Sequence, residues 1–346
     1  MFETIIDAIN TFLYSKLLIV ILIGSGIYFT VRTRFPQVRL FKNACSAVME
    51  KPEGDESVSS FQALMVSTAS RVGTGNIVGV SSAICIGGVG SVFWMWIIAI
   101  LGSASALAES TLAQIYKKKG KDGQCYGGPA YYIEAALHSR GLAVVFCIAM
   151  ILTYAFGFNM LASYNLQSTF SGQPFYNAEI TPWIIGGILA LVTGWCLLGG
   201  GNRIVKVTST LVPFMGIVYI LISLLVVVLN IGQLPSVLAQ IFEEAFDFKA
   251  IFAGFAGSAM MQGIRRGLYS NEAGIGSAPN AAATANVTHP VKQGLIQSLG
   301  VFTDTIVICS CTAFMVLLYQ DYSTIGLTGI ELTQAALSYH IGSIGH

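Results

Sequence analysis

The sequence predicts an all-α polytopic membrane protein, and three observations carry this prediction. Of the 346 residues, 54% are hydrophobic and 10% are charged, with a mean hydropathy of +0.70, whereas about 25% of the residues in a soluble protein are charged. Charges are absent from Val72–Ala108, Gly141–Ala178 and Val207–Phe242, each longer than the roughly 20 apolar residues of a transmembrane helix. The short alternating segments of a membrane β-barrel are not found. The net charge of +1 offers no basic field for a nucleic acid.

Hydropathy divides the chain into eight predicted transmembrane spans, which are separated by polar stretches rich in proline, glycine and charge. Their approximate limits are 12–31, 60–86, 90–116, 141–169, 182–198, 207–231, 249–268 and 293–320. Two amphipathic segments between them, Pro129–Leu137 and Pro235–Phe246, are expected to lie at the membrane interface.

Lysine and arginine are concentrated in alternate loops, which predicts the orientation because cytoplasmic loops carry the excess of basic residues. With the N-terminus outside, only Lys16 and Lys249 of the 18 basic residues fall in outside loops, and Arg71 falls within a span. Arg265 and Arg266 are counted with the inside loops in this scheme. We therefore expect a multi-pass protein of the cell (inner) membrane with an external N-terminus.

Two spans are interrupted by glycines, and they carry the functional signal. The second span contains Gly73, Gly75 and Gly79, and the seventh contains Gly254, Gly257 and Gly263. An interior glycine destabilises a helix by about 1 kcal/mol relative to alanine, and irregular backbone at membrane depth occurs where it is buried in protein or lines a cavity. A glycine-interrupted helix in each half of a chain is typical of a transporter binding site.

Three long motifs resemble the alanine/glycine:cation symporter family. ASRVGTGNIVGVSSAICIGGVGSVFWMWIIAILGSASALAE at Ala69–Glu109 is similar to its first two core helices. GIRRGLYSNEAGIGSAPNAAATA at Gly263–Ala285 is similar to its second signature, and GGPAYYIE at Gly127–Glu134 also matches. The resemblance extends from about residue 15 to the end and is weakest around Phe156–Gln167. It implies a sodium-driven importer of small neutral amino acids.

The resemblance also implies a LeuT-like inverted-repeat core. The predicted division is an N-terminal transmembrane helix and cytoplasmic loop over 1–59, a first five-helix repeat over 60–231, and a partial second repeat over 232–346 with core helices 6 and 7. Helices 1 and 6 are the interrupted pair and run in opposite directions, as inverted repeats require. Core helices 8 to 10 are missing, so we expect an incomplete, C-terminally truncated core that inserts but does not transport.

The broken helices suggest how a zwitterionic amino acid would be held. Free amides at the start of the helix near Asn76 carry a partial positive charge, so the substrate carboxylate is expected against Thr74, Gly75 and Asn76. The α-ammonium needs acceptors, which unwound carbonyls at the second break would supply. These are the carbonyls of Phe255, Ala256 and Gly257.

Sodium, the expected coupling ion, would bind at the first break beside the substrate carboxylate. Carbonyls of Val72 and Gly73, with the side chain of Thr74 or Asn76, are the predicted ligands. Substrate size is expected to be limited by Phe255, Met260 and Met261, which would leave room for little more than a methyl group, although ordinary helix packing explains these residues equally well.

Charged residues within the spans add gate candidates. Arg71 either pairs across an inner gate or extends to the cytoplasmic surface, and Glu109 or Asp304 would be its partner. Glu272 is expected to organise a loop near Arg265 or Arg266 rather than to bind substrate.

The resulting functional hypothesis is a sodium-coupled symporter that imports alanine or glycine by alternating access. A channel would need charged pore rings, and an enzyme would need clustered catalytic residues at membrane depth; neither pattern is found. The scattered cysteines and histidines predict no metal centre and no cofactor. The alternatives left open are a LeuT-like carrier of another small substrate, a proton-coupled carrier, and a transport-incompetent fragment. Sodium is favoured over protons because neither break was expected to carry a carboxylate. The oligomeric state stays open.

Overall fold

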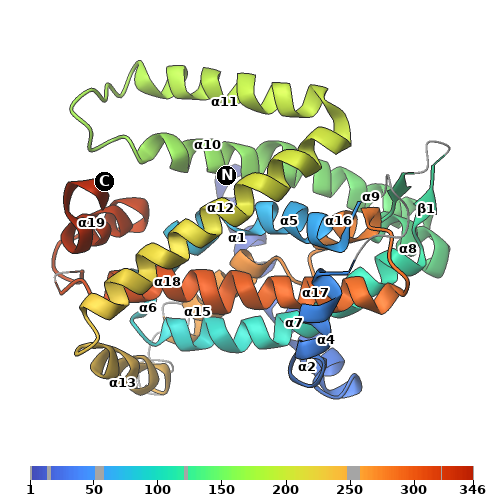
Figure 1. The fold of residues 1–346 in the computed structure, drawn as a ribbon, viewed down its shortest axis with the longest axis horizontal. Helices are drawn as coiled ribbons and strands as arrows, with labels where there is room; N and C mark the ends of the chain where they lie inside the picture. The colour runs from blue at the N-terminus through green and yellow to red at the C-terminus, as the bar shows by residue number, and fades with distance from the viewer. Residues whose placement is uncertain are drawn as a thin grey trace.

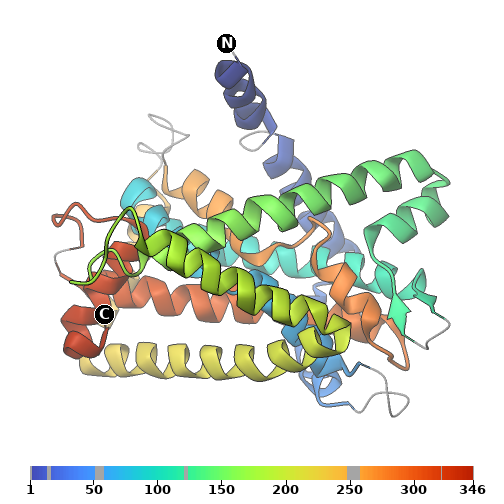
Figure 2. The ribbon, with the colours of Figure 1, turned by 90° about the horizontal axis from the view of Figure 1, so that it is seen from above.

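The computed structural model describes residues 2–13, 17–50, 58–120, 124–247, 258–320 and 322–345, and these are helical for most of their length. The chain begins with α1 (Phe2–Phe12), α2 (Leu18–Arg32), α3 (Pro36–Arg39) and α4 (Phe41–Val48). Helix α1 projects away from the remaining helices (Figure 2), whereas α2 packs along the central helix α7 (Ser91–Ile115).

The predicted second span is an interrupted helix in the structure. Its first half, α5 (Ser60–Arg71), begins with a capping box in which the Ser59 hydroxyl accepts from the Gln62 amide and the Gln62 side chain accepts from the Ser59 amide. The helix ends at Val72, whose φ of −75° and ψ of 108° are extended. A π-helical turn over Gly75–Gly79 then leads into α6 (Val80–Gly87).

Helix α7 forms the centre of the core because small side chains along it allow close helix packing. Its neighbours α2, α15 (Ala259–Asn271) and α17 (Pro290–Val301) all pack along it. After α7, a short hairpin pairs β1 (Lys118–Lys119) with β2 (Cys125–Tyr126), and Lys118 lies opposite Tyr126.

The middle of the chain forms long apolar helices at the edge of the core. After α8 (Pro129–Leu137), a continuous helical stretch comprises α9 (Arg140–Ile151), a π-helical segment (Leu152–Phe158) and α10 (Asn159–Ser168), and is followed by α11 (Thr181–Leu198) and α12 (Gly200–Leu229). Helices α10 and α11 form an outlying layer in Figure 1, and α11 contains no buried residue. Its apolar side chains therefore suit contact with lipid.

The last third of the chain returns to the core. It comprises α13 (Leu234–Ala245), α15, α16 (Ala278–Thr284), α17, a π-helical segment (Phe302–Cys309), α18 (Ser310–Leu317), α19 (Gly329–Ile341) and a final 3-10 turn (Gly342–Gly345). Figure 1 shows the line of α17 and α18 running beside α7 through the centre of the molecule. The largest buried apolar cluster joins α6, α7, α12, α13, α18 and α19 around Met95, Ile241, Met315 and Leu332.

Five helical stretches are long and apolar enough to cross a membrane by length and composition. They are Ser91–Ile115, Arg140–Ser168, Thr181–Leu198, Gly200–Leu229 and Pro290–Leu317, and each coincides with a predicted span. Two predicted spans are shorter or interrupted helices, namely α2 and the α5–α6 pair. The amphipathic segments predicted at 129–137 and 235–246 correspond to α8 and α13.

The seventh span differs from its prediction, which placed it at 249–268. Helix α15 follows α7 in the same direction, with Gly263 against Ser91 and Trp94 and Gly267 against Met95 and Ile98. Helix α16 continues toward the other end of α7, where the Gln114 side chain donates to the Ala282 carbonyl. The described part of the span therefore comprises α15 and α16 with an interruption between them, and it extends beyond the predicted limit of residue 268. Residues 249–257 lie outside the described residues.

Candidate functional site

The two interrupted spans lie side by side and run in opposite directions. Near one end, Val58 forms a β-bridge with Ala285. At the level of the interruptions, the Ser70 hydroxyl donates to the Glu272 carboxylate at 3.1 Å. Beyond the break, a Cβ atom on Gly75 would lie 3.2 Å from the Tyr269 ring. The breaks therefore face each other at the same depth.

The second break comprises residues 272–277 between α15 and α16. Glu272 ends α15 with a φ of +50°, and Gly274 and Gly276 follow with φ values of +85° and +90°. These conformations stop the helix, and glycine adopts them at little cost. The sequence prediction of a break at Gly254–Gly263 was wrong for Gly263, which lies inside α15 and lets the helix approach the Ser91 carbonyl of α7. Gly254 and Gly257 lie outside the described residues.

Two buried carboxylates hold this second break in place. One oxygen of Glu272 accepts from Ser70, from the Tyr154 hydroxyl at 2.9 Å and from Ser277 at 2.6 Å. A carboxylate oxygen of Glu109, on α7, accepts from the Gly274 amide at 3.1 Å. Glu272 thus organises the loop through hydroxyl groups, and among the described residues it forms no ion pair with Arg265 or Arg266.

The first break is organised by Asn76, which is fully buried. Its side-chain oxygen accepts from the Gly73 amide at 2.9 Å, and its amide nitrogen donates to the Asp304 carboxylate at 2.8 Å and to the Ser270 hydroxyl at 3.0 Å. The Thr312 hydroxyl donates to the Asn76 carbonyl at 2.8 Å. Asn76 therefore links the first interrupted span to both α15 and the π-helical segment before α18.

Asp304 is the anionic centre of this cluster. It is fully buried, and its second oxygen accepts from the Ser270 hydroxyl at 2.9 Å and from the Thr305 hydroxyl at 3.0 Å. A buried carboxylate is costly unless a cation or a proton compensates it. Carboxylate and hydroxyl oxygens converge here, and such oxygens are the ligands that hard cations prefer. The residues present therefore fit a small monovalent cation.

A cleft of about 660 Å³ lies beside the breaks, on the side of the π-helical turn Gly75–Gly79 and α15. Thr74, Gly79, Arg266 and Tyr269 contribute to its walls, together with residues of α2 and of the α9–α10 stretch. The Thr74 and Tyr269 side chains hydrogen-bond to each other. The cleft thus brings polar groups of both interrupted spans to one concave surface, as a small-molecule site requires.

Comparison with known proteins agrees with this geometry. The model of the sodium:alanine symporter family matches residues 1–346. The chain is 49% identical to a probable sodium/glutamine symporter, GlnT of Bacillus subtilis, over 99% of this chain and 71% of that protein. It is 47% identical to the amino-acid carrier protein AlsT of the same organism, over 99% and 72%. The chain belongs to the sodium:alanine symporter family.

A third relative is less similar in sequence to this chain and is named as an alanine symporter. The sodium/alanine symporter AgcS of Methanococcus maripaludis is 37% identical to this chain, over 97% of the chain and 75% of AgcS. Membership in this family makes the chain a membrane transporter and not an enzyme.

The transporter's predicted substrate residues do not all reach the cleft. Thr74 does, whereas Gly75 packs against α15 and Asn76 is fully buried. Met260 packs in an apolar cluster with residues of α2, α7 and α15, nine residues before Tyr269. Met261 is a buried member of the same cluster, so both lie in a helix interface. Phe255, Ala256 and Gly257 lie outside the described residues.

The sodium ligands predicted at the first break are brought together only in part. Val72 and Gly73 form the extended turn at the end of α5, and Gly73 donates its amide to Asn76. Thr74 points toward the cleft and Tyr269, while Asn76 points toward Asp304. The side chains of Thr74 and Asn76 therefore lie in different environments.

Arg71 is buried, with 3% of its surface exposed, so it does not extend to the membrane surface. One guanidinium nitrogen donates to the Gln297 carbonyl at 3.4 Å, and it interacts electrostatically with Glu109 and Asp304. Neither carboxylate lies within ion-pair distance of it among the described residues. A role for Arg71 as a gate stays a prediction.

Four residues of the site were not predicted as ligands. Ser270, Tyr269 and Arg266 belong to α15, which the sequence placed partly in a loop, and Asp304 was considered only as a partner of Arg71. An isolated Asp304 in an apolar span was the available signal, because intramembrane carboxylates are usually functional.

The positions of two carboxylates remove the reason for disfavouring proton coupling. Glu272 lies at the second break, and the Asp304 carboxylate is bonded to Asn76 of the first. Both breaks therefore carry a carboxylate.

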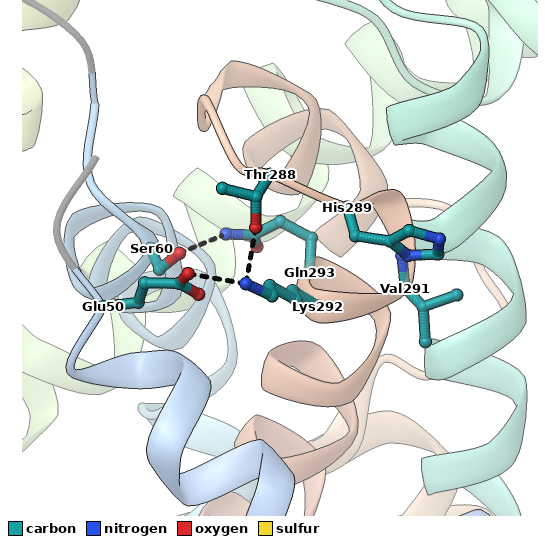
Figure 3. Close-up of polar contacts among 7 residues, drawn as sticks. All are labelled: Glu50, Ser60, Thr288, His289, Val291, Lys292 and Gln293. Atoms are coloured by element: carbon teal, nitrogen blue, oxygen red, sulfur yellow. Dashed lines mark hydrogen bonds and ion pairs between the residues drawn. The ribbon is translucent and has the colours of Figure 1, made fainter. Parts of the chain in front are cut away.

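Polar contacts also join the two ends of α5 and α17 that lie far from the cleft. Figure 3 shows the ion pair between Lys292 and Glu50, and the hydrogen bond that the Gln293 amide donates to Ser60. Lys292 also donates to Thr288. These contacts tie Glu50, after α4, and Ser60, at the start of α5, to the start of α17.

Proposed function

We propose that this transporter is a sodium-coupled symporter that imports small neutral amino acids, alanine or glycine, by alternating access. The observation that carries the proposal is the antiparallel pair of interrupted spans, whose breaks are joined through Asn76, Ser270 and Asp304. This arrangement suits a LeuT-like core, in which ions and substrate bind where two broken helices meet. The protein would lie in the cell membrane with its N-terminus outside.

The amino acid would bind at the junction of the breaks and the cleft. Its carboxylate would lie at the helix that follows Thr74, with the amides of Gly75 and Asn76 as donors once the helices part. Carbonyls of the second break, over residues 272–277, are suitable acceptors for the α-ammonium. They supplement the predicted acceptors at 255–257.

Sodium would bind next to Asp304. The carboxylate provides the charge, and the hydroxyl oxygens of Ser270 and Thr305 add to the donor set. When sodium is bound, it would neutralise Asp304 and fix the side chain of Asn76, which in turn holds the Gly73 amide. Ion binding thereby stabilises the conformation of the break at which the substrate carboxylate lies, and this is the physical basis expected for coupling.

The amino-acid affinity of the reconstituted protein should depend on sodium. Because coupling between two ligands is reciprocal, alanine affinity should be at least about fivefold higher in sodium than in choline. Binding of labelled alanine to proteoliposomes in the two salts, followed by uptake, checks this. Glycine and glutamine as competitors define the substrate class, since GlnT is named for glutamine.

Equal affinity in both salts with a steep dependence on pH would contradict sodium coupling. That result would favour the proton-coupled alternative, for which Glu272 and Asp304 are the available carboxylates. Absence of binding for every amino acid tested would contradict the proposed function as a whole.

The contact between Glu50, which follows α4, and Lys292 of α17 should act as a weak latch for the end of the protein proposed to face the cytoplasm. Glu50 and Lys292 are both about one-third exposed, so the pair contributes about 1 kcal/mol or less. Glu50→Gln should therefore increase opening at this end by no more than about fivefold. The reactivity of a cysteine introduced by Ser67→Cys, which is buried between α5 and Gln297, measures opening.

The matched control is Glu134→Gln on α8, which removes the same charge from an exposed position. High salt should reproduce the effect of Glu50→Gln by screening the pair. A change of more than tenfold, or an equal change in Glu134→Gln, would contradict a weak local latch.

A further inference from the structure

Arg266 is a cation on the wall of the cleft. It lies in α15, one helical turn before Ser270, and its aliphatic portion approaches Gly79, where an added Cβ atom would be 3.7 Å from the Arg266 Cδ. Across the part of the chain that the structure describes, no carboxylate lies within ion-pair distance of Arg266. Among the described residues, its charge therefore has no partner anion in the cleft.

An arginine without an ion-pair partner is unusual at the depth of Arg266 in the helix bundle. Gly267, the next residue, packs between Met95 and Ile98 of α7, well inside the apolar part of that helix. The cleft around Arg266 is walled mostly by apolar side chains, including Leu22, Val78 and Phe158. Arginine at membrane depth is costly and is normally paired or functional. An anion that enters the cleft would supply the missing partner.

We propose that Arg266 binds the carboxylate of the amino acid in the cleft, before the substrate moves to the breaks. This inference rests on the proposed function and adds to it an entry site that selects carboxylate-bearing substrates. A guanidinium presents two parallel N–H donors that match the two oxygens of a carboxylate. Thr74 and Tyr269 lie on the same cleft and are placed to receive the substrate next.

Glycine at position 79 is part of this site. With no side chain, it leaves the end of the π-helical turn open beside Arg266. An added Cβ atom on Gly79 would also lie 3.9 Å from the Thr74 carbonyl oxygen, so Arg266 and Thr74 are near each other on this wall. A substrate that passes from Arg266 to Thr74 would travel inward from the half of the spans proposed to face outside.

The test compares alanine with alaninamide, which lacks the carboxylate. In the wild type, alaninamide should compete for labelled alanine at least tenfold more weakly than alanine itself. Arg266→Gln should raise the KM for alanine at least tenfold at unchanged membrane level and bring the two competitors within about threefold of each other. Arg266→Lys should retain part of the discrimination, because the charge stays while the paired donors are lost.

Arg265→Gln is the matched control, since it removes the same charge from the neighbouring residue, which does not line the cleft. It should retain the wild-type discrimination between alanine and alaninamide. If Arg266→Gln also retains that discrimination, or weakens both ligands by the same factor, the entry site is refuted. A wild type that binds no amino acid refutes the proposed function instead, so the two failures are distinct.

Discussion

Replacing Gly75 by leucine should abolish amino-acid binding while the protein still inserts in the membrane. Position 75 is where the first break packs against α15, and a Cβ atom added there would lie 3.2 Å from the Tyr269 ring and 3.3 Å from the Ser270 Cα. A leucine side chain cannot be accommodated without moving α15 away from the first break. Overpacking of this kind costs about 3 kcal/mol, so binding should fall by about 100-fold or more.

The measurement is equilibrium binding of labelled alanine to purified protein in sodium. Gly186→Leu on α11 is the control, because the space around that glycine is open in the structure. It should bind alanine as the wild type does. Wild-type affinity in Gly75→Leu would show that the junction of the two breaks is not the binding site.

The helices themselves were largely predictable from the sequence. Spans such as Ser91–Ile115 and Gly200–Leu229 follow from uninterrupted apolar runs, because the bilayer requires an apolar helix of sufficient length. The first break was also predictable, because Gly73, Gly75 and Asn76 all have low helix propensity. The amphipathic helices α8 and α13 were expected for the same physical reason, an apolar face beside a polar one.

The second break was harder to predict because its composition resembles a loop. Residues 270–277 read SNEAGIGS, which is polar and glycine-rich, so the sequence placed them after the span. In the structure, the Ser70 and Tyr154 hydroxyls donate to Glu272 of this segment, and the Glu109 carboxylate accepts from its Gly274 amide. These partners are distant in the sequence, and hydropathy alone cannot reveal them.

The same limit applies to the ion site. Asp304 is isolated in an apolar stretch, and its bonds to Asn76 and Ser270 span 228 and 34 residues of sequence. Arg265 and Arg266 were counted as loop residues because two adjacent arginines are rare in a span. Their position in the middle of α15 follows from the close fit of Gly263 and Gly267 against α7.

Replacing Asp304 by asparagine should remove most of the sodium dependence. The substitution keeps the size and one carbonyl oxygen, so Asn76, Ser270 and Thr305 can retain hydrogen bonds to residue 304. The charge that would compensate sodium is lost. Because losing one member of a buried charge pair costs about 2 kcal/mol or more, apparent sodium affinity should fall by about 30-fold or more.

Sodium titration of alanine binding measures this effect, and Thr303→Val provides the control. Thr303 is the preceding residue, but it is exposed and its hydroxyl donates to the Leu299 carbonyl of its own helix. Ser270→Ala should give an intermediate loss, since it removes one oxygen and no charge. If Asp304→Asn titrates with sodium as the wild type does, the cation lies elsewhere. In that case, the cluster of Asn76, Ser270 and Asp304 only holds the two interrupted spans together.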